Sequence, residues 1–232
     1  MKNYLLIFFL VLAIPSFSQR EKETLAKIFI NIPDSFFSDL QTYQPDSIHI
    51  NKAMRKAMTD TLNVSDQWNP ILHFTAFDTV HHYLKLLAKE GDPEGKSCEI
   101  AYWNKADGSK LVVMTINYGD MCVEEQTYRY FWIYDGKQFT SVNESDVFPD
   151  IGSSYCISSL FLKTHKRARE TEMPYMISHD ENGEFIYSPE FDYLFDCDEY
   201  FKDDAWYGLR GKDILKNEVV LVWNGNRFDI GK

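Results

Sequence analysis

The sequence lacks the short motifs that mark the common hydrolase and metal-enzyme classes. It has no GxSxG elbow, no SxxK, no HExxH and no papain-like cysteine context. Its four cysteines have no CxxC spacing, so a thioredoxin-like or zinc-ribbon site has no support. We therefore predict no catalytic residue, no metal site, no cofactor-binding residue and no cofactor.

Basic residues are scarce in comparison with acidic ones. The 24 Lys and Arg residues face 35 Asp and Glu residues, which gives a formal net charge of −11. Nucleic-acid phosphates require Lys and Arg, so a nucleic-acid partner is not expected. The same excess argues against electrostatic docking on anionic lipid and indicates a solubilising surface.

The apolar run at the start of the chain is too short to span a bilayer stably. Tyr4 to Ile14 follows a basic start at Lys2, and Ser16 and Ser18 offer small residues before a cut at Gln19. This pattern predicts a secretory signal peptide over residues 1–18. No cysteine follows the run, so we expect a protein that is not a lipoprotein. We expect it to be exported to the periplasm or the medium, with no transmembrane segment after cleavage.

No linker rich in Pro, Gly or Ser divides the rest of the chain. We therefore predict one exported α+β domain over residues 19–232, mainly helical over 19–70 and mainly β over 71–232. Apolar residues recur with helical spacing over 19–30, after Asp34 and over 48–61. Residues 74–90 fit either a helix or a strand, and we favour a strand because a meander follows.

Three Asx-Gly pairs separate apolar or alternating segments. They are Asp107-Gly108, Asp135-Gly136 and Asn224-Gly225, and a further hairpin is expected around Asn182-Gly183. Asx-Gly suits a type I′ turn, whose two central residues need positive φ. The predicted fold is therefore a hairpin-rich antiparallel β-sheet with short N-terminal helices.

Aromatic residues are abundant, with 17 Phe, 14 Tyr and 5 Trp. They suit the half-buried surface of a sheet, and an aromatic binding face is the sharper alternative. Alternation along residues 219–223 places Trp223 on the face of Val219 and Leu221, so we expect it in the core. Trp103, Trp132 and Trp206 are then the candidates for an exposed binding face.

The cysteines and histidines leave further alternatives open. An even cysteine count in an exported chain permits two disulfides, and four buried thiols are the equal alternative. If disulfides form, proximity in sequence favours Cys98–Cys122 and Cys156–Cys197. Adjacent histidines point apart, which disfavours a metal site at His81 and His82 with His73. The acidic segment 196–204 lacks the spacing of an EF-hand. A nucleophilic cysteine paired with His165 or His179 is possible by composition alone.

Two segments resemble a known family. Ile28-Phe29-Ile30-Asn31-Ile32-Pro33-Asp34-Ser35, with the later Cys98-Glu99-Ile100-Ala101-Tyr102-Trp103 and Asp107-Gly108-Ser109, resembles secreted Bacteroidetes proteins of unknown function. In that family an MPDSL-like motif follows the signal peptide and precedes strand-rich sequence. Here Ile32 and Phe36 stand where Met and Leu are usual. The resemblance is clear over residues 28–40 and looser over 78–150. It implies a location in the cell envelope, and it implies no activity and no catalytic residue.

Taken together, these features favour an exported, non-enzymatic binding or interaction protein of the cell envelope. Its expected partner is an envelope protein or a glycan. A secreted hydrolase whose site assembles from distant residues is the alternative, because such a site leaves no motif.

Overall fold

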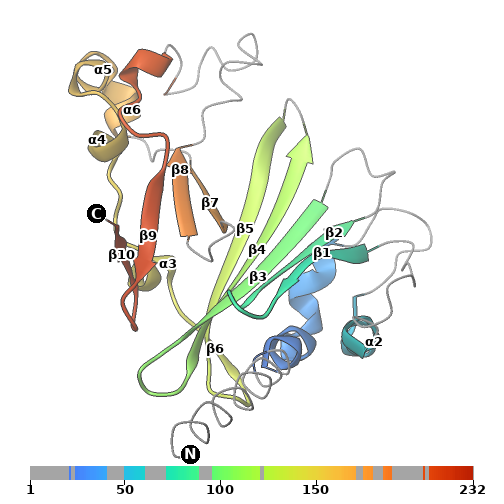
Figure 1. Cartoon of the computed structure of the whole chain (residues 1–232). Coiled ribbons are helices and arrows are strands. Elements are labelled where there is room, and N and C mark those ends of the chain that lie inside the picture. The colour runs from blue at the N-terminus through green and yellow to red at the C-terminus, as the bar shows by residue number, and fades with distance from the viewer. Residues whose placement is uncertain are drawn as a thin grey trace, which may run out of the picture. The chain divides into compact units, whose positions relative to one another are not determined.

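The computed structural model describes residues 21, 24–40, 50–60, 72–88, 96–120, 123–170, 175–179, 185–189, 206 and 209–231. The predicted signal peptide lies outside these residues. The fold is α+β, with two antiparallel sheets and several short helices (Figure 1). Contacts within the chain divide it into two compact units. The first comprises Met1–Asn104, Gly108–Tyr118 and Tyr128–Ser141, and the second comprises Lys105–Asp107, Gly119–Thr127 and Val142–Lys232.

Short helices open the first unit, as predicted. Residues 24–31 are helical, η1 (Asp34–Leu40) is a 3-10 helix, and α2 (Lys52–Asp60) follows. Asn51 caps α2, because its Oδ1 accepts from the backbone N of Met54 at 3.0 Å. The predicted apolar face of α2 is wrong in part, since Ala53 and Ala57 are exposed and a buried position is taken by Arg55.

Six strands form the sheet of the first unit, and each pairs only with its neighbours in sequence. The order is β1 (Leu72–Asp78), β2 (Tyr83–Ala88), β3 (Lys96–Asn104), β4 (Lys110–Asp120), β5 (Val123–Tyr134) and β6 (Phe139–Ser141). The ambiguous segment around residue 80 is thus a hairpin, in line with the strand favoured above. Alternation gives each strand one face toward the core.

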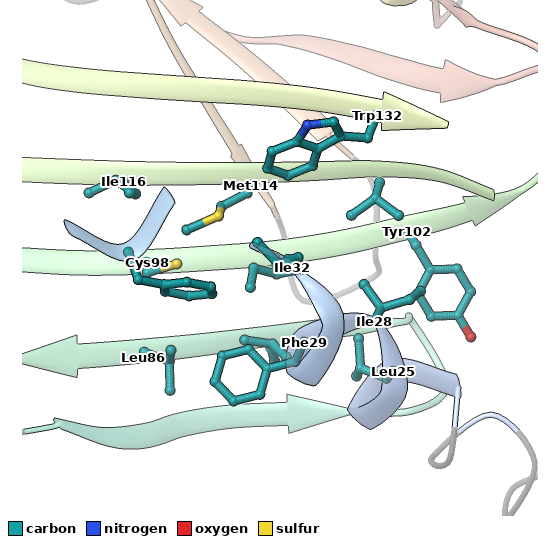
Figure 2. Packing of buried hydrophobic residues seen from close by; sticks show 14 of the residues in the cluster. Leu25, Ile28, Phe29, Ile32, Leu86, Cys98, Tyr102, Met114, Ile116 and Trp132 are labelled. Atoms are coloured by element: carbon teal, nitrogen blue, oxygen red, sulfur yellow. The ribbon is translucent and has the colours of Figure 1, made fainter. Parts of the chain in front are cut away.

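The core of the first unit lies between this sheet and the N-terminal helix. Figure 2 shows Leu25, Ile28 and Phe29 of the helix in front of the sheet that carries Tyr102 and Met114. All five side chains are fully buried. Helical spacing in one layer and alternation in the other therefore produce a single apolar interface.

The second unit combines short helices with a four-stranded sheet. Its helices are α3 (Glu144–Val147), α4 (Ser153–Cys156), α5 (Ser159–Thr164) and α6 (Lys166–Glu170), followed later by the 3-10 turn η2 (Gly211–Asp213). The sheet order is β10 (Phe228–Ile230), β9 (Val219–Trp223), β8 (Phe185–Pro189) and β7 (Tyr175–His179). Among the described residues, no helix has the length and apolarity needed to cross a membrane.

The predicted hairpins are confirmed, but the turn type is wrong. Positive φ occurs at Gly136 (97°) and Gly225 (98°) and not at the Asx residue before either glycine. Tyr134 pairs with Phe139, so four residues form that loop. Asp135 Oδ1 accepts from the backbone N of the third and fourth loop residues at 2.7 and 2.9 Å. The Asx side chain thus closes the turn in place of a second positive φ.

The fourth expected hairpin is formed by β7 and β8. The two strands pair antiparallel, from Tyr175 opposite Pro189 to His179 opposite Phe185. The Asn182-Gly183 turn that joins them lies outside the described residues, so its type stays a prediction.

Candidate functional site

The three tryptophans predicted to form a binding face are buried. Trp103, Trp132 and Trp206 expose 9%, 2% and 1% of their surface. Trp132 belongs to the core of the first unit and lies 4.9 Å from Phe36, ring centre to ring centre. Trp206 stacks parallel to Phe161 in the second unit. The expectation that these side chains are exposed is therefore wrong, because large aromatics fill the cores here.

Trp223 lies on the predicted face of β9 but is only half-buried. It pairs with Phe228, with 5.1 Å between the ring centres. The predicted two-residue turn would have paired Leu221 with Phe228. The four-residue loop moves the register by two positions, which preserves the faces, so Val219 and Leu221 are buried and Val220 is exposed.

Neither predicted disulfide forms. Cys98 and Cys156 are free, buried thiols, whereas Cys122 and Cys197 lie outside the described residues. Burial raises the pKa of both thiols, and Glu99 raises that of Cys98 further. A thiol with a raised pKa is a poor nucleophile, so these two cysteines serve as small core side chains.

The described residues contain no group of three or more His, Cys, Asp or Glu side chains placed to hold a metal ion. His81 binds Asp78, with Nδ1 2.7 Å from Oδ2, while His82 stacks on Tyr102. His165 stacks on Phe161 at 4.0 Å. The side chains of His73 and His179, and the acidic segment 196–204, lie outside the described part of the chain.

A polar cluster joins the start of the first unit to its sheet. We define the polar cluster as Glu21, His82 and Tyr102. The Tyr102 hydroxyl donates to Glu21 Oε2, and His82 Nε2 lies 3.4 Å from the same oxygen. The rings of His82 and Tyr102 stack with 4.3 Å between centres. One carboxylate oxygen therefore faces two ring groups that are fixed against each other.

The backbone fixes the position of His82 in this cluster. His82 ends the turn between β1 and β2 with a φ of 58°, the one positive φ at a non-glycine residue in the described chain. Its carbonyl accepts from Tyr102 N at 3.1 Å, and Asp78 Oδ1 accepts from Val80 N at 2.7 Å at the start of the turn. Left-handed backbone at a bulky residue costs free energy, so the surrounding hydrogen bonds must hold it.

Burial sets the protonation of the polar cluster. Burial lowers the pKa of His82, and the Glu21 carboxylate partly offsets this effect. Burial and then the Glu21 hydrogen bond raise the pKa of Tyr102 well above its ordinary value. At neutral pH the Tyr102 phenol is therefore protonated and the His82 imidazole is neutral. The polar cluster fastens residue 21 to β3 and offers a carboxylate as a proton acceptor.

A basic surface is the second candidate, in the second unit. We define the basic surface as the exposed side chains of residues 159–170 and 210–216. Its cations are Lys163, Lys166, Arg167, Arg169, Arg210, Lys212 and Lys216, and its acidic residues are Glu170 and Asp213. Basic residues thus outnumber acidic ones on this surface, whereas acidic residues outnumber basic ones in the whole chain.

Hydrogen bonds bring the two segments of the basic surface together. Ser158 N donates to the carbonyl of Asp213 at 2.7 Å, and Leu215 N donates to the carbonyl of Cys156 at 2.6 Å. Ile157 and Ile214 form an antiparallel bridge. Figure 1 accordingly shows the red segment around η2 beside α5 and α6. Two cation-bearing segments more than forty positions apart in sequence are thus adjacent in the fold.

Two exposed leucines accompany these cations. Leu160 is 70% exposed and Leu215 is 60% exposed. Leu160 and Lys163 lie three residues apart on α5, which places them on one helix face. Leu215 precedes Lys216, whose Nζ lies 4.1 Å from the centre of the Tyr155 ring. The basic surface therefore combines positive charge with apolar side chains that the fold leaves in water.

The sequence alone shows one half of the basic surface and gives no signal for the polar cluster. The run 163–169 is visibly basic, but only the pairing of residues 156–158 with 213–215 adds the second segment. The polar cluster joins residues 81 positions apart, and no periodicity signals such a contact.

Comparison with known proteins adds no relative. No family model, no curated protein and no solved structure matches the chain. The resemblance to secreted Bacteroidetes proteins stays a prediction.

Proposed function

We propose that the protein is an exported, non-enzymatic binding protein of the cell envelope, and that its basic surface binds an anionic envelope component. The observation that carries this proposal is the gathering of cations on 159–170 and 210–216 in a chain whose net charge is −11. Like charges are unfavourable when placed together, so an oppositely charged partner stabilises such a surface.

The acidity of the remaining chain does not oppose such binding. Charges in water are screened over about 8–10 Å at physiological ionic strength. A partner in contact with Lys163 and Arg167 therefore experiences mainly the charges of the basic surface. The interaction should weaken steeply as salt rises, since exposed ion pairs are screened first.

The test is binding of a soluble polyanion, dextran sulfate, measured by fluorescence anisotropy at several salt concentrations. The variant Lys163→Ser/Arg167→Ser/Lys212→Ser removes three exposed cations that, within the described residues, form no ion pair. The matched control is Lys27→Ser/Lys56→Ser/Lys137→Ser, three exposed lysines of the first unit. We expect weaker binding in the first variant alone. Equal affinity in both variants would overturn the assignment.

A secreted hydrolase is the second candidate, and the polar cluster favours it. Glu21 Oε2 is a carboxylate oxygen within reach of His82 and Tyr102, which is the kind of group that accepts a proton in hydrolysis. Chromogenic glycosides and esters test this candidate. Turnover by the wild type that Glu21→Gln abolishes would support it. Turnover unchanged in that variant, or none by either protein, argues against a role for Glu21.

A further inference from the structure

We infer that the anionic component is the phospholipid surface of a membrane, on which the basic surface docks with Leu160 and Leu215 inserted between headgroups. This inference rests on the proposed function and names the partner. It departs from the expectation drawn from net charge, which disfavoured anionic lipid, because residues 159–170 and 210–216 are rich in cations although the whole chain is acidic.

The first step is that the two leucines are held outward by the fold. On α5 the Ser158 side chain accepts from Phe161 N at 3.2 Å, and Phe161 and Leu162 are buried beneath. Leu160 therefore cannot turn inward without unwinding that helix. Leu215 is fixed by its own backbone hydrogen bond to Cys156. Both leucines are therefore available for contact with a partner, and the cations around them give that contact its charge.

The second step is that cations accompany both leucines. Lys163 shares a helix face with Leu160. Leu215 lies in the segment that carries Lys212 and Lys216, and the Lys216 ammonium donates to the Tyr155 hydroxyl at 2.8 Å. Leucine enters the boundary between headgroups and acyl chains, while a neighbouring lysine extends its charged end to the phosphates. A soluble polyanion would use the lysines and gain nothing from the leucines. A lipid surface uses both, and this distinguishes it among anionic partners.

The cations and the leucines would each strengthen binding to an anionic membrane by a measurable factor. Each Lys or Arg close to an anionic membrane strengthens binding by roughly fivefold. Each leucine transferred into the interface contributes roughly a further tenfold. Glu170 is 3.7 Å from Lys166 and 3.9 Å from Arg169, so it offsets part of the charge on α6. Lys163, Arg167 and Lys212 are then the cations most available to headgroups.

The experiment is vesicle co-sedimentation of the exported protein, whose N-terminus is checked by mass spectrometry. This check matters because the apolar run Tyr4 to Ile14 would itself bind lipid. Vesicles of phosphatidylcholine with roughly a third phosphatidylglycerol are compared with pure phosphatidylcholine, at about physiological salt. We expect binding to the anionic vesicles and roughly hundredfold weaker binding by Leu160→Ser/Leu215→Ser. Its affinity for dextran sulfate should not change.

The matched control is Val80→Ser, which removes an apolar side chain that is 76% exposed in the first unit. It should bind vesicles like the wild type. A Leu160→Trp variant gives a second readout, since brominated lipid should quench its added fluorescence. Binding of dextran sulfate without binding of vesicles, or vesicle binding unaffected in the double leucine variant, would overturn the lipid inference alone. Binding of neither probe would overturn the proposed function itself.

Discussion

Arg55 joins two segments of the first unit through one buried guanidinium. Its side chain is 1% exposed, and it donates to the carbonyls of Phe29, Ile32 and Ile50 at 3.0, 2.6 and 2.8 Å. The carbonyls near the end of a helix lack partners within the helix, so Arg55 supplies donors that residues 24–31 cannot. Burial lowers its pKa, while Asp34 raises it. The group nevertheless stays protonated at any physiological pH.

We predict that Arg55→Met lowers the free energy of unfolding by about 2–4 kcal/mol, because it leaves buried carbonyls without donors. Arg55→Lys should recover only part of this loss, since an ammonium cannot reproduce the planar fork. Urea unfolding followed by circular dichroism measures both. Lys56→Met, an exposed change on the same helix, is the control and should stay within about 0.5 kcal/mol of the wild type. An Arg55→Met protein as stable as that control contradicts the assigned role.

His82 should make stability depend on pH near neutrality. Its pKa is lowered in the folded chain, mainly by burial. The unfolded chain therefore takes up a proton at a higher pH than the folded chain does. Stability should fall as pH decreases below about 6.5, the ordinary value for histidine. Asn tolerates positive φ, so His82→Asn removes this titration with little backbone strain.

The expected result is that stability falls less between about pH 7.5 and about pH 5.5 in His82→Asn than in the wild type. Urea unfolding at the two pH values measures this change in the free energy of unfolding, without added metal or ligand. If the free energy of unfolding changes equally with pH in the two proteins, burial of His82 against Tyr102 does not lower its pKa as we infer.

At the scale of elements, the hairpin loops combine one Asx side chain with one left-handed glycine. Asn224 Oδ1 accepts from the backbone N of Asn226 and Arg227 at 2.9 and 3.0 Å. Gly225 has a φ of 98°, and a Cβ there would meet nothing within 4 Å. A substitution at Gly225 therefore changes backbone strain without any steric clash.

We predict that Gly225→Ala lowers the free energy of unfolding by about 1–2 kcal/mol. The matched control is Gly211→Ala in the same unit, where φ is not positive and an added Cβ again meets nothing within 4 Å. That change should be neutral or stabilise by up to about 1 kcal/mol, because it restricts the unfolded chain. Thermal unfolding monitored by circular dichroism compares them. Equal melting temperatures for the two variants would contradict the argument from φ.

The sequence predicted elements better than it predicted their details. Helical spacing at Leu25, Ile28 and Phe29 and the Asx-Gly pairs indicated the right elements, because both are local signals. The turn type was wrong because the Asx side chain closes the loop by accepting from two backbone N–H groups, without a second positive φ, and the Asx-Gly pair alone does not distinguish these two turns. The tryptophan exposures were wrong because alternation fixes which face a residue occupies and not what covers the face.

At the scale of the whole molecule, the two compact units share strands. β4 contributes residues up to Tyr118 to the first unit and begins the second unit at Gly119, and β5 is divided in the same way at Thr127. Because both units draw residues from the same two strands, we expect them to unfold together. The sequence predicted a single domain, which requires that the two units unfold together, and this stays a prediction.

We therefore expect one calorimetric transition for the exported protein, with equal calorimetric and van't Hoff enthalpies. Arg55→Met alters the first unit and Gly225→Ala the second, so each should move this one transition to lower temperature. Two resolved transitions, each sensitive to only one of the variants, would instead establish two independently folding domains.

The order of the strands has a consequence for how the chain would reach this fold if it is exported, as we propose. In both sheets every strand pairs only with its neighbours in sequence. Pairing of this kind closes short loops, so a chain that leaves a translocation channel from its N-terminus can add one strand after another. The helix of residues 24–31 emerges first and yet needs β2 to β4 beneath it. The first part to leave the channel must wait for later parts, and its apolar face is the surface a periplasmic chaperone would meet.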